Sequence, residues 1–167
     1  MIIRVLLESD AQQYQELRLN ALLTNPEAFG STYERENQFT LEFVAERLRP
    51  STDKFALGAF DKDGALIGIV SLVRETSMKT THKANVFGMY VDKEQRGLGV
   101  GKALMIELIK MARDIEGLEQ VNLCVVSNNE QAKKLYQSLG FERYGTERNA
   151  LKFNEQYYDE DLMVLRL

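Results

Sequence analysis

The sequence is poor in cysteine, histidine and proline: its 167 residues include one Cys, one His, two Pro and no Trp. One cysteine cannot form an internal disulfide, which indicates a reducing compartment, so we expect a cytoplasmic protein. One histidine and one cysteine cannot supply a typical zinc shell. The acidic run Asp159–Asp161 lacks the glycine and the ligand spacing of a calcium loop, and we therefore expect no metal.

An excess of basic charge and a long apolar run are also missing. The formal net charge is −4, which argues against nucleic-acid binding but is compatible with a cationic amine as ligand. No apolar run approaches the roughly 20 residues that span a bilayer, and Glu8 and Asp10 follow the first strand-like run, unlike a signal peptide. We expect neither nucleic acid nor a membrane as a partner, and a homodimer is compatible with the sequence.

The sequence does contain a regular series of strand-like and helix-like segments. A chain of this length suits one core, and no repeat or linker divides it, so we expect one domain over residues 1–167. Ser9-Asp10 is the expected cap of the first helix. Strands are predicted at residues 2–7, 54–60, 65–73, 83–91, 120–126, 142–152 and 157–166, and helices at residues 10–23, 40–49, 104–115 and 129–139.

The most informative stretch, Gln95–Lys102, is a glycine-rich turn between the expected strand Val86–Val91 and the expected helix from residue 104. Glycines let backbone N–H groups approach a ligand, and the positive end of a helix dipole favours an anion. Arg96 and Lys102 add formal charge at the two edges. The pattern indicates a phosphate site, and a tight turn with ordinary surface cations is the alternative.

Two better-known phosphate loops do not fit this stretch. A P-loop needs Ser or Thr after its Gly-Lys pair, but Ala103 follows Gly101-Lys102, and Arg96 occupies the first glycine position. A dinucleotide fingerprint, Gly-x-Gly-x-x-Gly, needs a glycine where Lys102 or Leu104 stands. Both readings are therefore excluded.

The spacing Arg-x-x-Gly-x-Gly over residues 96–101 resembles the pyrophosphate-binding signature of the GCN5-related N-acetyltransferase (GNAT) superfamily. A second segment resembles that family's other cofactor segment: Asn129-x-x-Ala132-x-x-Leu135-Tyr136-x-x-x-Gly140-Phe141. The resemblance extends from about Ile2 to the C-terminus. It implies an α/β (α+β) single-domain fold, a mixed twisted sheet of about six to seven strands flanked on both faces by about four helices. The strands at 86–91 and 121–126 should be parallel neighbours that splay apart near the cofactor.

The resemblance also implies acetyl-CoA as the cosubstrate, with Asn129 on its pantetheine region and Tyr136 near its sulfur. Tyr136 is the implied catalytic residue, which donates a proton to the leaving thiolate. Taken alone, Tyr136 also fits a core aromatic, and Ser127-x-x-Glu130 fits a capping box that simply starts a helix. The implied cofactor-binding residues are Met89, Tyr90, Val91, Arg96, Gly97, Leu98, Gly99, Val100, Gly101, Lys102, Asn129 and Tyr136.

The implied chemistry is direct transfer of acetyl to a neutral amine in a ternary complex. An ammonium group like that of lysine has a pKa of about 10.4, so a base or a water chain must remove its proton. Many members carry a carboxylate on the strand before the glycine turn, but residues 84–91 hold none. The remaining candidates for the base are Glu34, Glu36, Glu75, Tyr157, Tyr158 or water.

Two further residues bear on the mechanism. Gly88 interrupts the strand before the glycine turn, which suits either a bulge with free main-chain groups or close packing. A free backbone N–H there can stabilise the oxyanion. Cys124 lies in an apolar strand and is expected to be packed in the core, so an acyl-cysteine mechanism has little support.

Three functions fit the sequence, in this order. The first is an N-acetyltransferase acting on a small-molecule primary amine, such as a polyamine, an amino acid or an amino sugar. The second is an acetyltransferase of a protein N-terminus or a lysine side chain. The third is a catalytically silent CoA-binding module.

Overall fold

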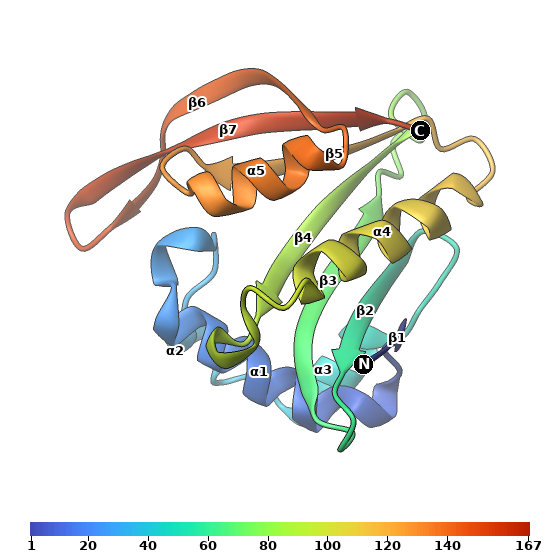
Figure 1. Cartoon of the computed structure of the whole chain (residues 1–167), viewed down its shortest axis with the longest axis vertical. Coiled ribbons are helices and arrows are strands. Elements are labelled where there is room, and N and C mark those ends of the chain that lie inside the picture. The colour runs from blue at the N-terminus through green and yellow to red at the C-terminus, as the bar shows by residue number, and fades with distance from the viewer.

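The computed structural model describes residues 1–167 as one seven-stranded sheet in the order β1-β2-β3-β4-β5-β7-β6, with helices packed against it (Figure 1). All neighbouring strands are antiparallel except β4 and β5, which are parallel. No helix is both long and apolar enough to cross a membrane. The strands are β1 (Ile2–Val5), β2 (Lys54–Phe60), β3 (Leu66–Arg74), β4 (Lys83–Val91), β5 (Gln120–Val126), β6 (Glu142–Phe153) and β7 (Gln156–Arg166).

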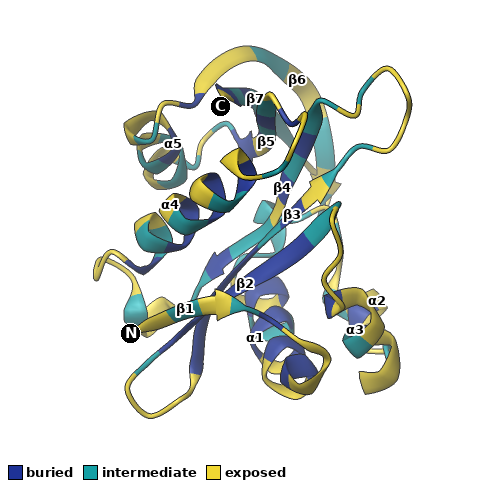
Figure 2. Cartoon of the chain, turned by 90° about the vertical axis from the view of Figure 1, so that its right-hand side faces the viewer, coloured by how far each residue is buried: buried dark blue, intermediate teal, exposed yellow.

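The helices lie on both faces of this sheet, as the resemblance implied. Helices α4 and α5 cover one face, and α1 and α3 cover the other (Figure 2). Strand β2, which lies between β1 and β3, is buried on both sides because its alternate residues belong to two separate apolar clusters. The helices are α1 (Ala11–Thr24), α2 (Tyr33–Glu36), α3 (Leu41–Leu48), α4 (Val100–Arg113) and α5 (Glu130–Ser138), with short 3-10 turns η1 (Glu8–Asp10), η2 (Pro26–Ala28) and η3 (Lys93–Gln95).

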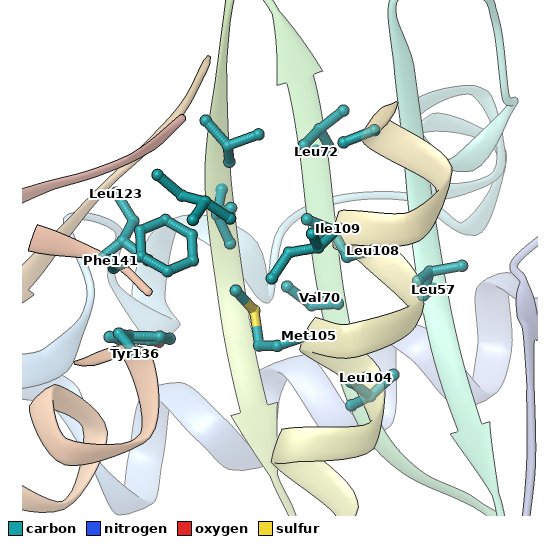
Figure 3. Close-up of a cluster of buried hydrophobic side chains, with 14 of the residues drawn as sticks. Leu57, Val70, Leu72, Leu104, Met105, Leu108, Ile109, Leu123, Tyr136 and Phe141 are labelled. Atoms are coloured by element: carbon teal, nitrogen blue, oxygen red, sulfur yellow. The ribbon is translucent and has the colours of Figure 1, made fainter. Parts of the chain in front are cut away.

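Helix α4 forms the larger core because its apolar residues recur at helical spacing on one side. Leu104 and Leu108 are completely buried against the sheet, next to Leu57 and Val70 (Figure 3). The helix begins directly after Gly99, whose φ of 79° allows the chain to turn sharply from the loop into the helix. The residues that pack α4 therefore also fix the position of the glycine turn.

Strands β4 and β5 pair for only a short distance before they separate. Their partners are Lys83 with Gln120, Ala84 with Val121 and Asn85 with Asn122. Beyond these pairs, the facing edges of both strands have no strand partner, although β5 remains paired with β7 on its other side. Helix α4 is the crossover that makes the parallel pairing sterically possible. The prediction of parallel neighbours that splay apart is confirmed.

The expected cap of the first helix is only partly right. Helix α1 begins at Ala11, directly after Ser9-Asp10, but the Asp10 carboxylate does not cap it. The carboxylate instead accepts a hydrogen bond from the Leu7 N–H at 2.8 Å and pairs with Arg4 at 2.7 Å. Asp10 therefore closes the preceding turn η1 and not helix α1, because the unpaired N–H groups at the start of η1 come earlier in the chain than those of α1.

Truncation inside α4 should show how strongly the core depends on this helix. The Leu108→Ala variant should lose about 2–5 kcal/mol of unfolding free energy, because the side chain is 0% exposed and leaves a cavity. Ile106→Ala on the same helix is the matched control, since Ile106 is 49% exposed and should change stability by only about 0.5 kcal/mol. Urea unfolding measures both. Equal losses would contradict the assignment of the core face.

Candidate functional site

A cleft of about 730 Å³ lies where β4 and β5 separate. Its walls come from η2, the second half of β4, the glycine turn, the N-terminus of α4, the end of β5 and helix α5. Of the implied cofactor-binding residues, all except Leu98 line this cleft. The Leu98 side chain is 70% exposed and does not contribute to the lining.

The glycine turn presents a row of free backbone donors to the cleft. No N–H group from Gly97 to Lys102 donates a hydrogen bond to a backbone carbonyl, and no side chain caps α4. The helical ladder starts only with the Ala103 N–H, which donates to the Gly99 carbonyl at 3.0 Å. Together with the positive end of the helix dipole, these donors are suited to binding an anion.

Glycine is required at two points of this turn for different reasons. Gly99 has a φ of 79°, which strains any residue with a side chain. At Gly101 the backbone conformation is ordinary, but an added Cβ would lie 2.9 Å from the Met89 Cε. Gly101 thus lets α4 approach β4 closely, and the helix N-terminus reaches the cleft.

The two cations at the edges of the turn differ in their partners. Arg96 donates from Nε to the Val91 carbonyl at 3.1 Å and from Nη2 to Asn25 Oδ1 at 2.7 Å. Its guanidinium also lies over the Tyr90 ring, 5.4 Å from the centroid. Arg96 therefore ties the turn to β4 and to the end of α1, whereas Lys102 is exposed and makes no ion pair.

Asn129 lines the cleft and also starts α5. Its side-chain oxygen accepts a hydrogen bond from the Ala132 N–H at 3.1 Å, whereas its amide nitrogen makes no hydrogen bond and is free to donate to a ligand. The alternative capping box from Ser127 to Glu130 is not formed, because the Ser127 hydroxyl donates to Asp161 at 2.8 Å instead.

Asp161 holds the start of α5 against β7. Its buried carboxylate accepts hydrogen bonds from Ser127 and, at 2.9 Å, from Thr146, and it lies 3.2 Å from the Lys133 ammonium. Burial alone would raise the pKa of Asp161, but the hydrogen bonds from Ser127, Thr146 and Lys133 outweigh burial and hold it below its usual value. The network fixes the helix that carries Tyr136.

Tyr136 lies at the inner wall of the cleft and is only 7% exposed. Its ring packs edge-on against Phe141, with the centroids 5.9 Å apart (Figure 3). Burial raises the pKa of its phenol to about 12. The side chain is thus a core aromatic that also borders the cleft, and its hydroxyl remains protonated at neutral pH.

A bulge interrupts the regular pairing of β4 with β3 beside the cleft. Tyr90 pairs with Ile69 and Phe87 pairs with Ser71, so Gly88 and Met89 stand between these pairs as an irregularity. Gly88 has a φ of 63° and lines the cleft. Of the two readings of Gly88, the structure favours the bulge.

None of the five side chains considered for the base lines this cleft. Glu36 is buried and forms a bidentate ion pair with Arg18, with nitrogen–oxygen distances of 3.0 and 2.9 Å. Burial opposes its ionisation, but the hydrogen bonds and the charge of Arg18 hold the pKa of Glu36 below its usual value. Glu75 accepts a hydrogen bond from Asn85 at 3.3 Å, and Glu34 lines a smaller neighbouring pocket. Tyr157 and Tyr158 lie near the tip of the β6–β7 hairpin.

The one carboxylate that does line the cleft is Glu27 in η2. Glu27 is not among the five side chains expected as the base, although it lies just after the end of α1 at Asn25-Pro26. The sequence did contain a signal for Glu27 as a candidate base. Glu27 is a carboxylate that directly follows the helix-ending pair Asn25-Pro26, in a loop next to the expected site.

The expectation for Cys124 is wrong. The thiol is exposed and lines the cleft, because it lies on the face of β5 opposite to the buried Leu123 and Val125. Partial burial and the nearby carboxylates of Glu160 and Glu147 raise the pKa of this thiol. A raised pKa disfavours the thiolate, which agrees with the low support for an acyl-cysteine mechanism.

The fold and the cleft define a class of protein: α/β domains in which two parallel strands separate beside a helix N-terminus with free N–H groups. The family model described as "Acetyltransferase (GNAT) domain" matches residues 3–162. The chain is also similar to the structure of a GNAT-family acetyltransferase from Streptococcus pneumoniae, with 25% identity, a TM-score of 0.88 and 99% of each chain covered. The chain belongs to the GNAT acetyltransferase family.

Two curated relatives are more similar in sequence. L-amino acid N-acetyltransferase AaaT of Escherichia coli is 32% identical over 102 residues, which cover 61% of this chain and 62% of the relative. Mycothiol acetyltransferase of Thermomonospora curvata is 33% identical over 127 residues, which cover 75% of this chain and 41% of the relative. The matches therefore span less than two thirds of either relative.

The environment of Tyr136 can be tested by alkaline titration. The ultraviolet difference between the wild type and Tyr136→Phe should show one phenol that ionises near pH 12. An unfolded tyrosine ionises at about pH 10. The contribution of the protonated Tyr136 to the free energy of unfolding is therefore complete below pH 10 and is lost as the pH rises through 12. The phenylalanine variant should lack this loss.

The control for that titration is the same pair of proteins in denaturant, where the difference step should return to about pH 10. A native difference step at about pH 10 would show that the phenol is open to water.

Proposed function

We propose that the protein is an acetyl-CoA-dependent N-acetyltransferase that moves acetyl to a primary amine of a small molecule by direct transfer. The observation that carries this proposal is the row of free N–H groups from Gly97 to Lys102 at the mouth of the splayed cleft. Such a row suits a pyrophosphate, which is the group that a CoA site must hold. We further propose that residues 1–167 act as one domain.

In this proposal the two separated strand edges hold the rest of the cosubstrate. The unpaired main chain of β4 after Asn85 offers hydrogen bonds along the cleft, and Asn129 offers its amide nitrogen. A free N–H at the Gly88 bulge stabilises the negative charge that develops on the carbonyl oxygen during transfer. Tyr136, a neutral phenol on the opposite wall, donates a proton to the departing thiolate.

Removal of a proton from the acceptor amine is assigned to Glu27 or to water. Glu27 is the carboxylate that lines the cleft, and position comes before pKa in choosing a base. Glu27 lies on η2 and Tyr136 on α5, so acid and base would come from different elements of the cleft.

The small-molecule acceptor is supported by the relatives, whose names specify L-amino acids and mycothiol. A thiol-release assay with polyamines, amino acids, amino sugars and peptides tests the proposal. Turnover on a small amine supports it, and preference for peptides would favour a protein acetyltransferase instead. Binding of acetyl-CoA without any turnover would leave a silent CoA-binding module.

The glycine turn should control affinity for acetyl-CoA. Gly99→Val combined with Gly101→Val should weaken binding by at least about 100-fold, because several charge-assisted hydrogen bonds to backbone N–H groups are lost. Isothermal calorimetry measures the affinity, and circular dichroism confirms that the variant is folded.

Gly64→Val is the matched control for the strain at Gly99. Gly64 has a φ of 83° and nothing within 4 Å of an added Cβ, as at Gly99, but it lies in the β2–β3 turn away from the cleft. This control should keep its affinity. Unchanged affinity in the double variant would remove the glycine turn from the proposal.

Tyr136→Phe should separate proton donation from packing. The ring is kept, so the affinity for acetyl-CoA should change little, while kcat on an identified amine should fall about 10²- to 10⁴-fold. Steady-state kinetics measures this. A variant with wild-type kcat would make Tyr136 a packing residue and leave protonation to water.

A further inference from the structure

Arg18, on the inner face of α1, has one nitrogen without a partner. Its side chain is 9% exposed, and its Nε and Nη2 donate to the two carboxylate oxygens of Glu36. The third nitrogen, Nη1, is buried and makes no hydrogen bond. Buried donors are almost always paired, because leaving one unpaired costs its desolvation. An unpaired guanidinium nitrogen therefore points to a ligand.

The free nitrogen lies directly behind the wall of the cleft, since Arg18 itself is not a lining residue. Arg18 Nη1 is 3.9 Å from the position of a Cβ on Gly88, and the guanidinium lies over the Phe29 ring, 4.7 Å from the centroid. Gly88 and Phe29 both line the cleft. Because Gly88 has no side chain, only its backbone lies between Arg18 and the cleft at this point.

Arg18 approaches the cleft wall at Gly88 from the face of the sheet opposite to the glycine turn. Helix α1 covers one face, whereas α4, with its free N–H groups, covers the other (Figure 2). An anion at Arg18 is therefore distinct from a pyrophosphate at the glycine turn. The Gly88 bulge, where transfer is proposed to occur, lies next to Arg18, so this anion belongs on the acceptor side.

Negative charge lies on the wall of the same cleft and close behind it. Glu27 is part of its lining, and Glu160 and Glu147 lie close enough to the lining residue Cys124 to raise the pKa of its thiol. Carboxylates suit an ammonium group, whereas a guanidinium edge suits a carboxylate. The acceptor side thus offers sites for both charges of one dipolar molecule.

We propose that Arg18 binds a carboxylate carried by the acceptor, so that the acceptor is an amine of the amino-acid class. Arg18 is a specificity-determining residue in this assignment, and Glu36 holds its guanidinium in place. The assignment rests on the proposed acetyl transfer for its activity readout, but its binding readout is independent of turnover.

The first test compares amino acids with their decarboxylated amines as acceptors of the wild-type enzyme. Loss of a hydrogen bond to a charged group should lower kcat/KM for the decarboxylated amines by about 10- to 100-fold, mainly through KM. The double variant Arg18→Met/Glu36→Leu removes both charges and leaves neither one unpaired. Its preference for amino acids should disappear, and the comparison of the two proteins cancels differences in amine basicity.

Glu36→Gln is the matched control, because it removes the charge of the ion pair while its amide oxygen can still accept a hydrogen bond from the Arg18 guanidinium and hold it in place. It should be less stable than the wild type and should keep the preference for amino acids. Calorimetry with acetyl-CoA should give wild-type affinity for the double variant and for Glu36→Gln, which shows that the cosubstrate site is intact. A preference retained in the double variant, or absent from the wild type, overturns the role of Arg18.

Binding of N-acetyl amino acids separates the two proposals. If no amine is acetylated, the proposed function fails, but calorimetry with N-acetyl amino acids still tests Arg18. Affinity that falls at least about 10-fold in the double variant, but not in Glu36→Gln, supports the carboxylate site. Equal affinity in all three proteins, or binding of N-acetyl amines without a carboxylate just as tightly, overturns it.

Discussion

The separation of β4 from β5 is the constraint on which the site depends. A parallel pair would normally continue along the full strands, but here pairing ends after Asn85 and Asn122. Each strand keeps its outer neighbour, so the sheet remains continuous while its middle opens. The opening exposes main-chain edges that elsewhere would be satisfied within the sheet. The cleft is thus made from backbone groups that the fold leaves unpaired.

The protein leaves backbone donors free in two further ways, each of which uses glycine. At the turn before α4, a left-handed Gly99 turns the chain so that the first N–H groups of the helix point into open space. At the β4 bulge, Gly88 interrupts pairing with β3. Backbone donors have fixed positions because they do not depend on a side-chain rotamer. They are therefore suited to stabilising a negative charge at a defined position.

The fold could be predicted well from the sequence, because its signals are local. Strands β2, β4 and β5 begin and end as predicted, since β-branched and apolar runs are bounded by charged or turn residues. The spacing of Gly97, Gly99 and Gly101 indicated the anion site, because positive φ angles and close helix packing both require glycine. Such requirements act within a few residues, and the sequence displays them directly.

The individual roles in the site depend on distant neighbours and were harder to predict. Arg96 binds Asn25, which lies 71 residues away, and no local pattern indicates that contact. Cys124 alternates with Leu123 and Val125, so strand periodicity placed it on the other face, but only the opened sheet shows that this face borders a cleft. Arg18 follows the inward-facing Tyr14 by four residues, and this position on the buried side was a signal that the sequence did contain.

The short pairing of β4 and β5 also determines how the molecule can deform. Strands β1–β4 form one half of the sheet and β5–β7–β6 the other, and the halves are joined by the ladder at Lys83–Asn85 and by the core beneath α4. Any change in cleft width must therefore bend the sheet at that ladder or slide α4 over its packed leucines. Close packing makes sliding of α4 costly in free energy. Bending is therefore expected at the Lys83–Asn85 ladder, while α4 keeps its position on the sheet.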